Sequence, residues 1–353
     1  MLNRYTMKNL VKITVLLLIV VSCTKTPDFS NLHYSFGGGV LILNEGNFRG
    51  GNGSLSFYSY DSSKIFNDLF YNVNGRSLGD VPNSIVIKGD KAYIVVNNSG
   101  KIEVIDKASL ESRATIRGLI SPRNIGIIND NKAYVSSLYS DSVAILNLTD
   151  FSISGYINLR RTSEAITVVG GKVFISNWAG GKEIMVISTI NDKVVDSIKV
   201  GIEPESMVLD RFGKLWVLCN GGWARQNYAE LIEINPPTNS IEKTLVFPTK
   251  DASPSCLSID GIGQTLYFLD NGVREMDIGS GVLPLTHLIE QKPGEYFYKI
   301  GINPINSDVF VTDAVDFAQQ GYLSIYTPKG TFISKMKAGI IPGSMCFKLR
   351  INS

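Results

Sequence analysis

A short motif that recurs along the chain limits the possible folds more than any other sequence feature. It consists of a proline, a variable residue, a small residue and an aliphatic residue, and it occurs at residues 82–85, 122–125, 204–207, 254–257 and 342–345. Two degenerate copies at residues 163–166 and 297–300 fill the gaps, so that successive copies start 40, 41, 41, 50, 43 and 45 residues apart. A period of about 40 to 50 residues is typical of the blades of a β-propeller.

The residues within each repeat predict four strands. The motif opens an inner strand, and β-branched and aromatic residues then alternate with polar ones at residues 91–100, 132–137, 172–177 and 214–220. A third strand and an outer strand complete each unit. Two β-sandwiches would give one change of spacing near the middle of the chain, and a helical solenoid would need a sustained 3.6-residue pattern; the chain shows neither.

The two ends of the chain predict how the ring closes. Three strands are expected before Pro82, at residues 40–43, 54–60 and 65–71, and one after Pro342, at residues 344–349. Together they make one blade whose innermost strand is C-terminal, and sharing it removes the exposed edges of an open sheet. We therefore predict an all-β, seven-bladed propeller of four-stranded blades over residues 40–353.

The N-terminus resembles a bacterial lipoprotein signal. Arg4, Lys8 and Lys12 precede an apolar run at residues 13–21, which is too short to span a bilayer as a helix of about 20 residues. The run ends beside Cys23, as in a lipobox, so we expect a signal peptide at residues 1–22, acylation of Cys23 and a tether over residues 23–39. An ordinary signal peptide that contains a cysteine is the alternative.

Composition argues against several classes of function. Without residues 1–22 the chain has 31 basic and 32 acidic side chains, a net charge of −1, which does not favour nucleic acid as a partner. His33 and His287 are the only histidines, and no nucleotide, metal or redox motif is found. We expect no cofactor and no metal. Cys219, Cys256 and Cys346 are expected to be free thiols, with a disulfide as the alternative.

Propeller geometry selects the candidate binding residues. The loops that enter the inner strands and those between second and third strands surround one mouth of the central channel. The variable motif residues should ring this mouth, whereas the small residues that follow them should wedge between blades. Long loops with aromatic residues and glycines suit a bulky planar ligand. The predicted ligand-binding residues are Asn44, Glu45, Asn47, Phe48, Asn83, Arg123, Glu164, Trp178, Glu205, Trp223, Gln226, Tyr228, Tyr298, Asp313 and Phe317.

Two alternatives for these residues stay open. Trp178 and Trp223 could instead cover the ends of the sheets. Glu45, Glu164 and Glu205 could supply a carboxylate pair for hydrolysis, although we predict no catalysis.

The second strands at residues 93–97 and 173–177 resemble those of YVTN-type propellers. The segments at residues 43–48 and 52–56 are similar to the start of YncE-like propeller lipoproteins of Bacteroidetes, and the resemblance covers about residues 40–350. That family includes the BtuG cobalamin-binding surface lipoproteins, which pass their ligand to a TonB-dependent transporter.

The resemblance implies an outer-membrane lipoprotein at the cell surface, in contact with the membrane through its lipid anchor only, that binds a corrinoid. The leaflet stays open, because Asp28 is the only acidic residue after Cys23 in the tether. A glycan-binding or scaffold lipoprotein and a propeller lyase or hydrolase are the alternative functions.

Overall fold

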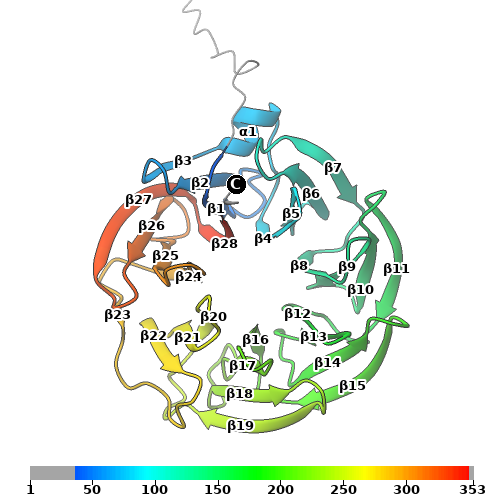
Figure 1. Cartoon of the computed structure of the whole chain (residues 1–353), viewed down its shortest axis with the longest axis vertical. Helices are drawn as coiled ribbons and strands as arrows, with labels where there is room; N and C mark the ends of the chain where they lie inside the picture. Colours follow the sequence, from blue (N-terminus) through cyan, green and yellow to red (C-terminus); the bar gives the residue numbers. More distant parts are fainter. Residues whose placement is uncertain (1–35, 350–353) are drawn as a thin grey trace, which may run out of the picture. The chain divides into compact units, whose positions relative to one another are not determined.

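A computed structural model describes residues 36–349 of the chain, which form seven four-stranded antiparallel sheets arranged around a central channel (Figure 1). The predicted fold is confirmed. Cys23, the signal peptide and most of the tether lie outside the described residues. No helix within residues 36–349 has the length and apolar character needed to cross a membrane.

Each blade is built from an inner, a second, a third and an outer strand, in chain order for blades 1 to 6. The inner strands, which surround the channel, are β4 (Pro82–Lys88), β8 (Pro122–Ile127), β12 (Ile166–Val169), β16 (Pro204–Leu209), β20 (Ser255–Ile259), β24 (Phe297–Ile302) and β28 (Pro342–Lys348). The second strands of blades 1 to 7 are β5 (Lys91–Val96), β9 (Lys132–Ser137), β13 (Lys172–Ser176), β17 (Leu215–Cys219), β21 (Thr265–Leu269), β25 (Val309–Asp313) and β1 (Gly39–Asn44).

The outer half of each blade follows the same order. The third strands are β6 (Lys101–Asp106), β10 (Ser142–Asn147), β14 (Glu183–Ser188), β18 (Glu230–Asn235), β22 (Gly272–Asp277), β26 (Gln320–Tyr326) and β2 (Ser54–Ser59). The outer strands are β7 (Ser112–Arg117), β11 (Ser152–Asn158), β15 (Lys193–Lys199), β19 (Ser240–Val246), β23 (Ile289–Glu290), β27 (Phe332–Ile340) and β3 (Lys64–Phe66).

Blade 7 joins the two ends of the chain, as the sequence predicts. Its order is β28-β1-β2-β3, and Gly39 of β1 pairs with Lys348 of β28. All seven sheets are complete within residues 39–348, so the ring closes without the N-terminal segment.

The prediction of a strand at residues 65–71 is wrong for residues 67–71. Strand β3 ends at Phe66, and a short helix, α1 (Leu69–Asn74), follows it. Asp68 has a φ of 56° and interrupts the extended backbone. Leu69 and Phe70 are buried and Val73 packs against the same core cluster, because Val73 lies three and four residues after them and such positions share one helix face.

The small motif residues connect neighbouring blades, as expected. The Ser84 hydroxyl donates to the Arg123 carbonyl at 2.7 Å, and the Asn124 side-chain amide donates to the Glu164 carbonyl at 3.1 Å. In the next blades, the Leu257 amide donates to the Ser206 hydroxyl at 2.9 Å. These bonds fix where the variable residues beside them point.

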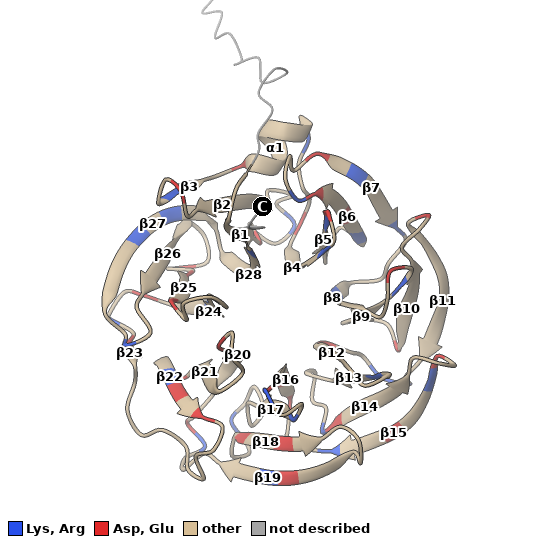
Figure 2. Cartoon of the chain, viewed as in Figure 1, with Lys and Arg blue, Asp and Glu red and all other residues tan. Residues whose placement is uncertain are grey.

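The two faces of the ring differ in what they carry. One face holds the channel mouth, where inner strands begin and where second and third strands are joined. The other face holds the turns between inner and second strands, and the described chain enters there: Gly39 pairs with the last residue of β28, and the Phe36 amide donates to Ala108 in the β6–β7 turn. Basic and acidic side chains are interspersed around the ring (Figure 2).

Candidate functional site

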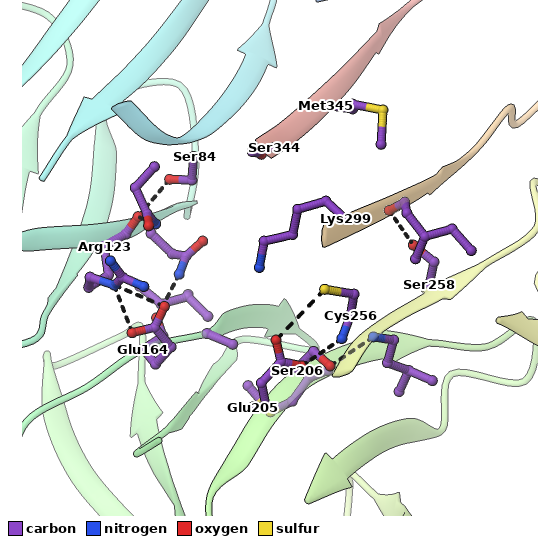
Figure 3. Close-up of a pocket in the computed structure, with 17 residues that line it drawn as sticks. Ser84, Arg123, Glu164, Glu205, Ser206, Cys256, Ser258, Lys299, Ser344 and Met345 are labelled. Carbon is purple, nitrogen blue, oxygen red and sulfur yellow. Dashed lines mark hydrogen bonds and ion pairs between the residues drawn. The ribbon is translucent and has the colours of Figure 1, made fainter. Parts of the chain in front are cut away.

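Two adjoining cavities occupy the channel and its mouth. The channel cavity has a volume of about 290 Å³ and is lined by the inner strands of all seven blades. The mouth cavity, of about 320 Å³, lies beside it under the loops of blades 3 to 6. Both include Arg123, Glu164, Glu205, Cys256 and Lys299, which are labelled in Figure 3.

Arg123 and Glu164 form an ion pair across two neighbouring blades. The Nε atom of Arg123 lies 3.0 and 2.8 Å from the two carboxylate oxygens of Glu164, and the two side chains are 20% and 12% exposed. Burial lowers the pKa of Arg123, but the Glu164 carboxylate outweighs burial and holds that pKa above its ordinary value. The pair places a fixed, polar wall on one side of the channel.

Glu205 and Cys256 form a second wall, which adjoins the first. The Cys256 amide donates to a Glu205 carboxylate oxygen at 2.8 Å, and the Cys256 thiol donates to the Tyr298 carbonyl at 3.4 Å. Cys256 has a φ of 60°, an uncommon conformation for a non-glycine residue, where the pairing of β20 with β21 shifts register. Burial raises the pKa of this thiol to about 11, so it is neutral at pH 7. All three described cysteines are free, as predicted.

Lys299 is the charged residue that the sequence analysis missed. It occupies the small-residue position of the motif in blade 6, and Figure 3 shows it reaching from β24 into the space between the two walls. Within residues 36–349, no carboxylate oxygen lies within 4.0 Å of its ammonium group.

The charges around Lys299 nevertheless hold it protonated. Negative charge on Cys256 raises the pKa of Lys299 most, ahead of Glu205, while burial lowers it. Because the Cys256 thiol is neutral at pH 7, the Glu205 carboxylate is the nearby anion that favours the ammonium form there. A lysine in a position that is otherwise small was the signal that could have revealed this residue.

Glu45 and Tyr298 meet above the channel from opposite parts of the sequence. The Tyr298 hydroxyl donates to a Glu45 carboxylate oxygen at 2.7 Å. Burial raises the pKa of Glu45, although the Tyr298 hydrogen bond and the nearby Lys299 and Arg123 charges oppose this rise. Burial also raises the pKa of Tyr298. Glu45 therefore reaches the site through Tyr298, and it does not line either cavity.

Aromatic side chains surround the mouth cavity. Trp178, Trp223, Tyr296 and Tyr298 line it, and Trp223 is 86% exposed. Phe317 supports this rim, because its ring packs edge-on against Tyr296 and Tyr298 at centroid distances of 4.7 and 5.5 Å. An exposed indole above a polar cavity offers flat apolar area to a planar ligand.

The structure brings together seven of the predicted residues directly at the cavities. They are Asn83, Arg123, Glu164, Trp178, Glu205, Trp223 and Tyr298. Asn83 also donates a hydrogen bond from its amide to the Arg123 carbonyl at 2.7 Å. The alternative that Trp223 covers the end of a sheet does not fit its exposure.

Two predicted residues lie inside the blades. The Asn44 side chain is fully buried and bonds to Ser54, Ser56 and the Gly339 amide. Asp313 is 2% exposed, accepts from the Tyr296 and Val315 amides and pairs with Lys335 at 3.1 Å. Their assignment to the ligand-binding site is therefore wrong. Both side chains form hydrogen bonds at the end of a strand, and neither lines a cavity.

Four further predicted residues lie outside both cavities, on the mouth loops. Asn47 bonds to Asn52 within its own loop, and Phe48 is 66% exposed. Gln226 is exposed, and the Tyr228 ring stacks with the Lys250 ammonium at 5.6 Å. The Asn47 side chain also donates to the Phe317 carbonyl at 3.5 Å, which links this loop to the aromatic rim. No cluster of three or more potential metal ligands occurs in the described part of the chain.

Fold and site together define a seven-bladed β-propeller with a charged channel beneath an aromatic mouth. The chain belongs to the family described as Domain of unknown function (DUF5074), whose model matches residues 38–328. No protein of curated function matches the chain in sequence. The finer resemblance to cobalamin-binding lipoproteins stays a prediction.

Solved structures share this fold at low sequence identity. A quinonprotein alcohol dehydrogenase-like protein of Bacteroides thetaiotaomicron has a TM-score of 0.69 and 15% identity over 90% of this chain and 79% of its own. A protein of Lactobacillus plantarum has a TM-score of 0.65 and 10% identity over 88% and 99%. A putative 6-phosphogluconolactonase of Bacteroides uniformis has a TM-score of 0.64 and 12% identity over 88% and 100%. These likenesses show the fold alone.

Proposed function

We propose that this protein is a lipid-anchored, non-enzymatic binding protein that captures a large planar solute at the channel mouth. Cobalamin or another corrinoid is the first candidate, with hand-over to a TonB-dependent outer-membrane transporter. The observation that carries the proposal is the aromatic rim, with Trp223 86% exposed, which lines a cavity of about 320 Å³ together with charged residues such as Arg123 and Lys299. Such a site combines apolar contact area with a few convergent polar groups.

The size of the cavities suggests how such a solute would sit. A cavity of about 320 Å³ is at the lower end of the range for small-molecule sites. It would admit a projecting group of a corrinoid, while the ring system lies over Trp223 and Trp178. Amide side chains at the edge of the ring could then bond to Glu205 and Lys299, whose polar atoms face the cavity.

The hydrogen bonds and ion pairs that the three carboxylates form with the protein support a binding role and not a catalytic one. Glu164 is held by Arg123, Glu205 by the Cys256 amide and Glu45 by the Tyr298 hydroxyl. A glycoside hydrolase uses one carboxyl group to protonate the substrate and a second as base or nucleophile, whereas each of these three groups is engaged with a protein partner.

Calorimetry tests the proposal with a form of the protein that begins at Thr24, which retains every sheet. We expect heat on titration with cyanocobalamin and coloured ligand co-eluting on gel filtration. Trp223→Ala should weaken binding about tenfold, because a stacked aromatic is worth about 1 kcal/mol or somewhat more. Phe212→Ala is the matched control, since Phe212 is 70% exposed on the opposite face.

Three results would count against parts of the proposal. Neither heat nor retained colour would remove corrinoids as ligands. Heat with oligosaccharides, lost in Trp223→Ala, would favour the glycan-binding alternative. Chemical change of a bound solute, detected by mass spectrometry, would contradict a non-enzymatic role.

The anchor and the transporter need separate tests. Incorporation of labelled fatty acid should be lost in Cys23→Ser, and unchanged labelling would contradict acylation at Cys23. Purification of the anchored protein from its own membranes should recover a TonB-dependent transporter if the proposed hand-over is direct.

A further inference from the structure

Three neighbouring turns on the face opposite the channel mouth carry large exposed apolar side chains. Phe212 lies in the β16–β17 turn, Ile262 in the β20–β21 turn and Ile305 in the β24–β25 turn, and they are 70%, 68% and 71% exposed. A single exposed apolar residue is ordinary. Three at equivalent turns of consecutive blades form a feature that needs an explanation. We call them the apolar tips.

The three turns are in contact with one another, so the apolar tips form a row. The Arg211 amide donates to the Gly263 carbonyl at 3.0 Å, which joins the first turn to the second. The second abuts the third so closely that a Cβ on Gly261 would lie 1.8 Å from the Pro304 carbonyl oxygen. Exposed apolar side chains on three contacting turns are a candidate interaction site.

Side-chain caps hold each turn in a fixed shape. Asp210 accepts from the Phe212 and Lys214 amides at 2.8 and 2.9 Å. Asp260 accepts from the Gln264 amide at 2.7 Å, and Asn303 accepts from the Ile305 amide at 2.9 Å. These bonds fix the backbone of the turns, so the tips cannot fold back onto the blades without breaking them.

The corresponding turns of the other blades lack such tips. Blade 1 has Gly89 and Asp90 there, blade 2 has residues 129–131, which are Asn, Asp and Asn, and blade 3 has Gly170 and Gly171. The apolar tips therefore occupy one half of this face only.

The position of the N-terminal chain points to a membrane as the occupant. The described chain enters at the same face, since Gly39 pairs with the end of β28 and Phe36 bonds to the β6–β7 turn. Only 12 residues separate Cys23 from Phe36, and they can span at most about 45 Å. A lipid on Cys23 would therefore be attached through the face that carries the apolar tips, which makes this face the one nearer to the anchor.

The charge beside the apolar tips also suits a lipid surface. Arg211 is exposed next to Phe212 and has no carboxylate within 4.0 Å in the described part of the chain. Two of the three acidic residues in these turns, Asp210 and Asp260, are buried against the backbone, and the third, Asp308, is partly buried and accepts from the Asn306 side chain at 2.7 Å. The Arg211 guanidinium donates to the Gln264 side-chain oxygen at 3.2 Å and lies 5.5 Å from the centre of the Phe212 ring. Apolar side chains beside a basic residue are typical of interfacial membrane binding.

We propose that the apolar tips insert into the membrane interface, so that the propeller stands on the bilayer with its channel mouth toward the solution. Insertion of the apolar tips would add a second membrane contact to the lipid anchor. The inference rests on the proposed function only for the lipid on Cys23. The orientation leaves the mouth accessible to solute and to a partner protein.

Vesicle flotation tests the proposal without the lipid. The form that begins at Thr24 is mixed with excess vesicles of phosphatidylethanolamine and phosphatidylglycerol. We expect this form to float with the vesicles. A triple variant, Phe212→Ser with Ile262→Ser and Ile305→Ser, should partition into the vesicles at least a hundredfold less, because each lost side chain should weaken binding by about tenfold. Ile120→Ser with Tyr139→Ser is the matched control, because both residues are exposed on the mouth face.

The possible outcomes separate this proposal from the others. Failure of the wild type to float, or equal flotation of the triple variant, overturns it. Self-association that the triple variant abolishes would assign the apolar tips to a protein interface and also overturn it. Thermal unfolding checks that the triple variant is folded. Its binding of cyanocobalamin should equal that of the wild type, so a failed membrane test leaves the ligand proposal intact.

Discussion

The Arg123–Glu164 pair allows a quantitative test of how the channel wall is built. We expect Arg123→Met and Glu164→Met each to destabilise the propeller, while the double variant has nearly wild-type stability. Removing one partner leaves the other charge unpaired in a partly buried site, whereas replacing both with apolar side chains removes the cost of desolvating two ions.

The structure sets the size of the effect. The side chains are 20% and 12% exposed, so the pair lies between an exposed pair, worth up to about 1 kcal/mol, and a fully buried one, whose disruption costs about 3 to 5 kcal/mol. We expect each single change to cost about 2 kcal/mol, which lowers Tm by about 4 °C in a domain of this size. The backbone carbonyls of both residues, which accept the interblade hydrogen bonds, remain in every variant.

Thermal unfolding followed by circular dichroism measures all four proteins. The Lys88–Asp130 pair is the matched control, since its N–O distance is also 2.8 Å but its side chains are 45% and 86% exposed. Replacing either control residue should leave Tm unchanged. If the double variant loses as much stability as the two single variants combined, the pair is not energetically coupled and our description of the wall is wrong.

Three further predictions concern the thiols, the pH response and the closure of the ring. Burial raises the pKa of Cys256 and of Cys346 to about 11, so iodoacetamide should label both thiols slowly at pH 7 and faster toward pH 11. A bound ligand should protect only Cys256 from labelling. Equal protection of both thiols, measured by peptide mass spectrometry, would contradict the proposed position of the ligand. Because burial raises the pKa of Glu45, its protonated form stabilises the fold below the ordinary value of 4.5 and this stabilisation is lost as pH rises through the raised pKa. Glu45→Gln should therefore raise Tm at pH 7 but not at pH 4. Equal Tm values of the variant and the wild type at pH 7 would contradict a raised pKa of Glu45. Removing residues 342–353 deletes β28 and exposes the edge of β1, so gel filtration should show aggregation in place of a folded monomer.

The spacing of the motif was sufficient to predict the ring, because each copy begins an inner strand and the period fixes the number of blades. The split blade followed from counting strands before Pro82 and after Pro342. The helix at residues 69–74 was missed because Leu69, Phe70 and Val73 are apolar in a pattern too short to distinguish from a strand. Short apolar runs carry no decisive periodicity.

The candidate site was predictable as a location but not as a set of contacts. The motif placed Arg123, Glu164 and Glu205 around the channel, because equivalent positions of a ring share one radius. It could not show that Tyr298 bonds to Glu45, 253 residues away in sequence, because that contact depends on how blades 6 and 7 are rotated. Nor could strand ends such as Asn44 be assigned to one face without knowing the local register.

One repeated position explains how a nearly symmetric fold acquires a specific site. In blades 1, 2, 3, 4 and 7 the third motif residue is small: Ser84, Asn124, Ala165, Ser206 and Ser344. Ser84, Asn124 and Ser206 each form a hydrogen bond to the next blade. Blades 5 and 6 instead place a thiol and an ammonium group there, Cys256 and Lys299, and both line the two cavities. The thiol and the ammonium group of the channel therefore lie on one side of it, next to Tyr296 of the mouth, while Arg123 and Glu164 line another side. A ligand should accordingly bind off the axis of the ring, over blades 3 to 6, where Trp178, Trp223 and the Lys299 ammonium line one cavity.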